Sequence, residues 1–216
     1  MTINRPPSPP HSSQPVLRGG PDPHVARLAL ILVHGRGGSA GEMLDLAAEL
    51  QLDDAALLAP QAAGNTWYPY SFLSPMDRNE PGLSSGLGVL AGLVAELGEA
   101  GMESHRVAIL GFSQGACLSL EFAARHPKGY AAIVGLSGGL IGPPGTPREY
   151  KGSLAGTAVF LGCSDIDAHI PVERVRESSE VFRRLGAEVD ERIYPGMGHT
   201  INRDELDAVR TLLQPK

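Results

Sequence analysis

The pentapeptide Gly-Phe-Ser-Gln-Gly at residues 111–115 follows an apolar segment at 107–110 and opens a helical pattern that runs to Arg125. In this strand-to-helix context, a G-x-S-x-G element is typical of a tight turn that lifts Ser113 above the edge of a sheet. The flanking positions need glycine because the turn leaves little room for side chains. The N-terminal end of the following helix stabilises negative charge near the serine oxygen. The motif therefore predicts that Ser113 is a nucleophile.

The rest of the chain alternates apolar, strand-like segments with amphipathic, helix-like ones. The run LALILV at 28–33 is apolar throughout, which fits a strand that is buried on both faces. Alternating strands and helices imply parallel strands with right-handed crossovers, so we predict an α/β fold with a mostly parallel central sheet and helices on both faces. Further strands are expected at 56–59, 107–110, 131–136, 158–163 and 189–194, and helices at 41–50, from a serine cap at 84 or 85 through 97, after the serine motif to 125, at 173–185, and after an Asn202 cap supported by Glu205.

A serine nucleophile needs a base, because serine is weakly nucleophilic at its free pKa. In sheets of this kind the usual chain order is serine, then an acid, then histidine. The histidines after Ser113 are His126, His169 and His199. His126 is expected to be a solvated residue at a helix end. His199 follows the last predicted strand in a turn rich in glycine and proline, so we predict that His199 is the base.

The acid that would orient His199 is expected just after the strand at 158–163. Asp165 and Asp167 both follow this strand, and either carboxylate could accept the second ring N–H of His199. The alternation of Asp165, Asp167 and His169 also resembles a set of metal ligands. A lone Asp-x-Asp-x-His pattern is a weak signal, and no metal is expected.

Backbone amides that stabilise a tetrahedral oxyanion are expected from two segments. One amide is that of Gln114, the residue after the nucleophile. The second is expected from the glycine-rich segment 34–38, where Arg36 is the first candidate and Gly35 and Gly37 are the alternatives. His34 precedes the serine in the chain and is expected to be an orienting or core residue. The segment lacks the Lys-Ser/Thr of a phosphate-binding loop.

Residues 1–24 are rich in proline and almost free of apolar side chains, which predicts a disordered leader before a single domain at 25–216. The leader has no hydrophobic core of a signal peptide, and the apolar run at 28–33 is too short to span a membrane. A soluble, cytoplasmic protein is therefore expected.

Charge and cysteine content exclude other classes of protein. The net charge of −6 and the lack of a basic run argue against a nucleic-acid partner. Cys117 and Cys163 are expected to be small buried residues, because a chain of 216 residues needs no disulfide to build a core. The sequence carries no signal for an oligomeric state.

Four motifs together resemble one family: LVHGRGG at 32–38, GFSQGA at 111–116, D-x-x-I-P at 167–171 and GMGHT at 196–200. Over residues 29–213 the sequence is similar to the phospholipase/carboxylesterase family of α/β-hydrolases, which includes the acyl-protein thioesterases. The resemblance implies an α/β-hydrolase fold without a separate cap domain. It also implies a cleft bordered by residues 61–82, with Trp67, Tyr68 and Phe72 as candidate substrate-binding residues. Ordinary core packing is an equally good reading for Trp67.

The family pattern Gly-x-x-Asp-x-x-Val/Ile-Pro favours one aspartate over the other. Counting back from Pro171 makes Asp167 the acid without a gap, and puts Ser164 where the family has glycine. Counting forward from Gly162 makes Asp165 the acid, but requires a two-residue insertion before Pro171. We therefore predict Asp167 and keep Asp165 as the alternative.

These residues together predict a serine hydrolase that cleaves carboxylic esters or thioesters through an acyl-enzyme on Ser113. Carboxylesterases, lysophospholipases and acyl thioesterases are enzymes with this chemistry. This chemistry needs no cofactor, and its partner is a small ester or thioester substrate. Two alternatives remain: a non-catalytic protein that binds an apolar ligand on the same scaffold, and an acyltransferase.

Overall fold

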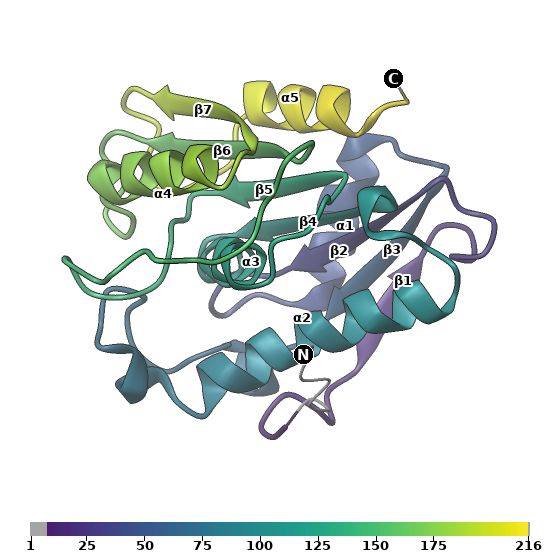
Figure 1. Cartoon of the computed structure of the whole chain (residues 1–216), viewed down its shortest axis with the longest axis horizontal. Coiled ribbons are helices and arrows are strands. Elements are labelled where there is room, and N and C mark those ends of the chain that lie inside the picture. The colour runs from purple at the N-terminus through teal and green to yellow at the C-terminus, as the bar shows by residue number, and fades with distance from the viewer. Residues whose placement is uncertain (1–7, 216) are drawn as a thin grey trace.

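The computed structural model describes residues 8–215, and within them seven strands form one sheet in the order β1-β3-β2-β4-β5-β6-β7 (Figure 1). β1 pairs antiparallel with β3, and all other neighbouring strands are parallel. The strands are β1 (Val16–Gly19), β2 (Leu28–Val33), β3 (Ala55–Pro60), β4 (Val107–Phe112), β5 (Ala132–Leu136), β6 (Ala158–Ser164) and β7 (Glu188–Tyr194). The predicted strands and their mostly parallel arrangement are confirmed.

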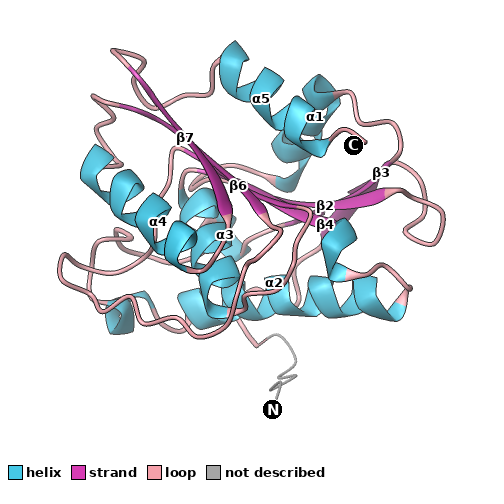
Figure 2. Cartoon of the chain, turned by 45° about the horizontal axis from the view of Figure 1, so that its top comes forward, coloured by secondary structure: helices cyan, strands magenta, loops and turns pink. Residues whose placement is uncertain are grey.

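Helices cover both faces of the sheet, as predicted. Figure 2 shows α1 and α5 on one face and α2, α3 and α4 on the other. The helices are α1 (Ala40–Leu50), α2 (Gly82–Glu99), α3 (Gln114–Arg125), α4 (Val172–Arg184) and α5 (Arg203–Leu213), with short 3-10 turns at Ala63–Asn65, Met76–Asn79 and Ser104–Arg106. Within residues 8–215, none of the helices combines the length and the apolar character needed to cross a bilayer.

The continuous apolar character of β2 follows from this layered arrangement. Leu28, Leu30 and Leu32 face the core under α1 and α5, while Ala29, Ile31 and Val33 face the core on the opposite side. Alternate side chains of a strand point to opposite faces, so a strand between two helical layers must be apolar at every position. The strands β4 and β5, at the centre of the sheet, are buried in the same way.

The prediction of a disordered leader over residues 1–24 is wrong for the part that forms β1 and for His11. β1 pairs with β3 from Val16 opposite Pro60 to Gly19 opposite Leu57. His11 is only 2% exposed. Strand pairing at a sheet edge uses backbone groups, so a segment of low apolar content can still pair when a neighbouring strand offers its edge. Residues 1–7 of the predicted leader lie outside the described residues.

The starts of two helices compare differently with the sequence predictions. The predicted cap of α2 at serine 84 or 85 is wrong, because the helix begins at Gly82 after Pro81 and Ser85 lies inside it. Ser85 instead accepts a hydrogen bond from a backbone amide of the N-terminal segment. The predicted capping box of α5 is confirmed, with Asn202 and Glu205 each accepting a hydrogen bond from the other's backbone amide.

Candidate active site

Ser113 lies in the turn between β4 and α3, in a backbone conformation that non-glycine residues rarely adopt. Its φ is 55° and its ψ is −118°, and its amide donates a 2.9 Å hydrogen bond to the carbonyl of Leu136. A Cβ atom on Gly111 would lie 2.3 Å from the carbonyl oxygen of Gly115, and one on Gly115 would lie 2.1 Å from that of Val33. Both glycines are therefore required by close backbone approach, and the strained serine is held in place by the surrounding structure.

A continuous chain of hydrogen bonds joins three residues from distant parts of the sequence. The Oγ atom of Ser113 lies 2.8 Å from Nε2 of His199. The Nδ1 atom of His199 lies 2.7 Å from Oδ2 of Asp167. The three residues follow β4, β7 and β6, and they meet because the carboxyl ends of parallel strands lie at one edge of the sheet. If Nδ1 carries the ring proton, Nε2 is free to accept the proton of the serine hydroxyl.

The carboxylate of Asp167 is built to remain ionised. Its side chain is fully buried. Its Oδ1 atom accepts hydrogen bonds of 2.8 and 3.0 Å from the amides of His169 and Ile170. Burial by itself would raise the pKa of Asp167, but the hydrogen bonds from His199 and from these two amides outweigh it and lower the pKa. An ionised carboxylate at this place can orient the imidazole and stabilise its protonated form.

The structure brings Asp167, and not Asp165, to His199. Asp165 is exposed. Its carboxylate accepts a 2.8 Å hydrogen bond from the amide of Gly196, and its own amide donates to the carbonyl of Tyr194. Asp165 therefore holds the turn that precedes His199 and does not contact the imidazole.

Asp165, Asp167 and His169 do not converge on one point. Within residues 8–215, no group of three or more His, Cys, Asp or Glu side chains has an arrangement that could hold a metal ion.

His34 joins the glycine-rich loop to the segment that follows β3. The residue is 1% exposed. Its Nδ1 lies 2.7 Å from the carbonyl oxygen of Gly35, so Nδ1 carries the proton, and its Nε2 accepts a 3.0 Å hydrogen bond from the amide of Ala62. Burial lowers the pKa of His34 and favours the neutral imidazole. This placement agrees with the expected orienting role, and His126 is exposed at the end of α3, also as expected.

Three backbone amides near Ser113 remain available for an oxyanion. The amide of Gly37 is engaged by the carbonyl of Asn65 at 2.7 Å, and the amide of Gly38 by the carbonyl of Gly35 at 3.1 Å. Across the described part of the chain, the amides of Gly35, Arg36 and Gln114 have no hydrogen-bond acceptor. This pattern disfavours Gly37 and leaves Arg36, the first candidate, and Gly35 as possible partners of Gln114 in an oxyanion hole.

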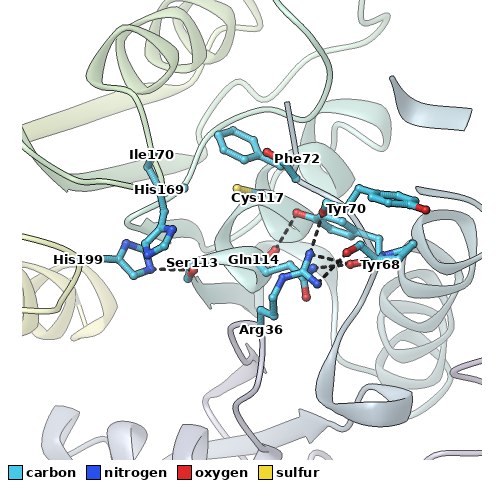
Figure 3. A pocket seen from close by; sticks show the side chains of 12 residues that line it. Arg36, Tyr68, Tyr70, Phe72, Ser113, Gln114, Cys117, His169, Ile170 and His199 are labelled. Atoms are coloured by element: carbon cyan, nitrogen blue, oxygen red, sulfur yellow. Dashed lines mark hydrogen bonds between the residues drawn. The ribbon is translucent and has the colours of Figure 1, made fainter. Parts of the chain in front are cut away.

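A cavity of about 370 Å³ opens beside Ser113 (Figure 3). Tyr68 and Phe72 line it, as the sequence predicted. Trp67 does not line it, which corrects the prediction of a substrate-binding role. Its indole is fully buried between the rings of His11 and His34 and donates a 2.9 Å hydrogen bond to the carbonyl of His34. Besides these, the cavity is lined by Arg36, Pro69, Tyr70, Ser71, Ser113, Gln114, Cys117, His169, Ile170 and His199.

Sequence reasoning missed several lining residues that carried a usable signal. Cys117 lies in the first turn of α3, four residues after Ser113, and its amide donates a 3.0 Å hydrogen bond to the Ser113 carbonyl, so the two residues lie close together. It is buried as predicted, and burial raises the pKa of its thiol to about 12, which keeps the thiol protonated. The amides of His169 and Ile170 donate hydrogen bonds to Asp167, and this contact brings both residues to the cavity. The position of the acid in the sequence could therefore have indicated them.

The strand order, the serine turn and the order serine, aspartate, histidine define an α/β-hydrolase. The family model described as phospholipase/carboxylesterase matches residues 21–215. The chain belongs to this family and is a carboxylic ester hydrolase.

Known relatives agree with this assignment. Acyl-protein thioesterase 1 of Saccharomyces cerevisiae is 27% identical over 88% of this chain and 92% of that protein. Acyl-protein thioesterase 1 of Gibberella zeae is 32% identical over 54% of this chain, and the match spans half of that protein. The crystal structure of a phospholipase/carboxylesterase from Dyadobacter fermentans superposes with a TM-score of 0.90 at 40% identity, over 94% of this chain and 97% of that one.

Proposed function

We propose that the protein hydrolyses carboxylic esters or thioesters through an acyl-enzyme on Ser113. The observation that carries this proposal is the unbroken hydrogen-bond chain from Ser113 through His199 to Asp167, with distances of 2.8 and 2.7 Å. Both distances lie in the range required for proton transfer to and from a nucleophile.

In the first half of the reaction, Oγ of Ser113 attacks the carbonyl carbon while Nε2 of His199 takes the hydroxyl proton. The amides of Arg36 and Gln114 donate hydrogen bonds to the developing oxyanion. The tetrahedral intermediate collapses, the bond to the leaving oxygen or sulfur breaks, and His199 gives its proton to the leaving alcohol or thiol.

In the second half, His199 removes a proton from water, and the hydroxide formed attacks the acyl group on Ser113. The bond to Oγ breaks, Oγ recovers the proton from His199, and the carboxylic acid leaves. Asp167 stays ionised throughout and stabilises the imidazolium that forms in each half.

The lining of the cavity beside Ser113 indicates that the cavity holds the acyl group of the substrate. Its wall presents the rings of Tyr68 and Phe72 together with the apolar side chain of Ile170. Apolar and aromatic linings with few polar groups are the usual environment for such groups. Relatives are named acyl-protein thioesterase and carboxylesterase, so both oxygen and thiol esters are candidate substrates.

Labelling with a fluorophosphonate tests the proposal. We expect one adduct per wild-type chain, located on Ser113 by mass spectrometry, and none in folded Ser113→Ala. An absence of labelling in folded wild-type protein would instead favour a non-catalytic ligand-binding protein. Adding alcohols that compete with water for the acyl group, and measuring the new ester that forms, would identify an acyltransferase.

A further inference from the structure

One wall of the cavity is an irregular segment, residues 66–72, which we call the pocket wall. It contains no helix or strand. It supplies Tyr68, Tyr70 and Phe72 to the cavity lining. A segment without its own secondary structure depends on side chains from elsewhere to fix its position.

Arg36 holds three consecutive carbonyl groups of the pocket wall. Its Nη1 donates a 3.0 Å hydrogen bond to Pro69, and its Nη2 donates bonds of 2.9 and 2.7 Å to Tyr68 and Tyr70. Figure 3 shows the guanidinium turned toward this segment. Within residues 8–215, these carbonyls are its hydrogen-bond partners. A planar guanidinium with several fixed donors suits such a contact better than an ammonium does.

Gln114 holds the same wall through its side-chain amide. Its Nε2 donates a 2.8 Å hydrogen bond to the carbonyl of Tyr68, and its Oε1 accepts one of 2.8 Å from the amide of Trp67. The carbonyl of Tyr68 is therefore shared between Arg36 and Gln114. The backbone amides of both residues also lack a hydrogen-bond acceptor within the described chain.

We infer that Arg36 is a positioning residue that couples the pocket wall to the oxyanion hole and thereby determines acyl-group selectivity. Its guanidinium holds the backbone that carries the Tyr68 and Tyr70 rings, while its own backbone belongs to the loop that faces the oxyanion. A displacement of the wall thus changes both the fit of the acyl group and the alignment of its carbonyl. This inference rests on the proposed function.

The test compares Arg36→Met with wild type on a series of 4-nitrophenyl esters from acetate to octanoate. We expect the ratio of kcat/KM between the best and the worst ester to fall by roughly tenfold, which is about the discrimination that a fitted apolar pocket provides. We also expect kcat on the best ester to fall about 10- to 100-fold, because small misplacements of the reacting carbonyl are costly. Amide hydrogen exchange of residues 66–72 should become faster in the variant.

Arg78→Met is the matched control. The guanidinium of Arg78 lies over the ring of Tyr70, 4.4 Å from the ring centroid. This variant therefore removes a cation that packs against the pocket wall but keeps the carbonyl contacts of Arg36. We expect Arg78→Met to keep the wild-type selectivity ratio. Arg36→Gln serves as a second variant if Arg36→Met does not fold, because its amide can bind only one or two of the carbonyls.

Wild-type selectivity and wild-type exchange in Arg36→Met would overturn the inference, and so would equal losses in Arg78→Met and Arg36→Met. Failure of the proposed function has a different signature, namely no Ser113-dependent hydrolysis by the wild-type protein. The exchange measurement does not require activity, so it still reports whether Arg36 holds the pocket wall.

Discussion

The side-chain oxygen of Ser164 accepts a 3.1 Å hydrogen bond from the backbone amide of Gly198, the residue before His199. Ser164 ends β6 and is fully buried. The bond ties the turn that carries the imidazole to the strand that leads to Asp167. Ser164 stands where the family pattern has glycine, so this chain replaces an empty position with a hydrogen-bond acceptor for the histidine turn.

Removal of this hydroxyl should weaken catalysis more than binding. In Ser164→Ala the amide of Gly198 loses its partner, and we expect kcat to fall about 10-fold with KM little changed, because the position of His199 becomes less defined. Steady-state kinetics on one ester measure both constants. Ser179→Ala is the control, since Ser179 is also fully buried but its hydroxyl has no partner in the described structure. Wild-type kcat in Ser164→Ala would refute this role.

The two candidate acids should differ strongly when each is changed to the isosteric amide. Asp167→Asn loses the charge that orients and stabilises the imidazole, so we expect kcat to fall by roughly 10³- to 10⁴-fold. Asp165→Asn keeps an oxygen that can accept from Gly196, and we expect a loss of less than about 10-fold. Equal losses in the two variants would contradict the assignment of Asp167.

His11 should make the stability of the protein sensitive to acid. Its Nδ1 accepts from the amide of Ala63 and its Nε2 donates to the carbonyl of Trp67, so the folded state requires the neutral imidazole. Burial lowers the pKa of His11. The unfolded chain therefore binds a proton first as the pH falls, and the contribution of His11 is present above its ordinary pKa and lost below it.

His11→Gln tests this contribution, because a glutamine amide can accept and donate without titrating. Between about pH 7.5 and 5, we expect the free energy of unfolding to fall more in wild type than in His11→Gln, by roughly 1 kcal/mol. Urea unfolding at each pH gives the difference. Parallel curves for the two proteins would show that His11 does not titrate on unfolding.

Glu205 should act in the opposite direction. Its side chain is fully buried at the start of α5, one carboxylate oxygen has no partner within the described chain, and burial raises its pKa to about 7. Because the folded pKa exceeds the unfolded one, the folded state is favoured at low pH. This contribution is lost as the pH rises from about 4.5 to about 7.

The comparison with Glu205→Gln isolates this group, since glutamine can still accept the cap hydrogen bond from Asn202. Relative to the variant, wild type should lose on the order of 1–3 kcal/mol of unfolding free energy across that pH window. The buried glutamine amide changes the free energy of unfolding by the same amount at every pH, so this effect cancels when values at different pH are compared. A difference that does not change with pH would contradict a raised pKa.

The sequence was sufficient for the features that depend on local pattern. The apolar run of β2 predicted a strand buried on both faces, and the glycines around Ser113 predicted a turn in which side chains do not fit. The capping box of α5 was predictable from Asn202 and Glu205, because both partners lie within one helical turn.

Features that depend on long-range contacts were not readable. Trp67 and Tyr68 are adjacent large rings, and only the fold shows that the first packs between two histidines while the second lines the cavity. The edge strand β1 was missed because its pairing uses backbone groups, which composition does not reveal. The choice between Asp165 and Asp167 needed a family pattern, since both follow the same strand.

Acylation of Ser113 can be detected by rapid acid quench of the enzyme during turnover of an ester, followed by mass spectrometry of the intact protein and its peptides. We expect a mass increase equal to one acyl group, on the peptide that contains Ser113, which appears before steady state and is absent in Ser113→Ala. Cys117 lies four residues after Ser113 and lines the same cavity, so fragmentation must assign the adduct to one of the two side chains. Acyl transfer to Cys117, or rapid turnover by folded Ser113→Ala, would contradict the account.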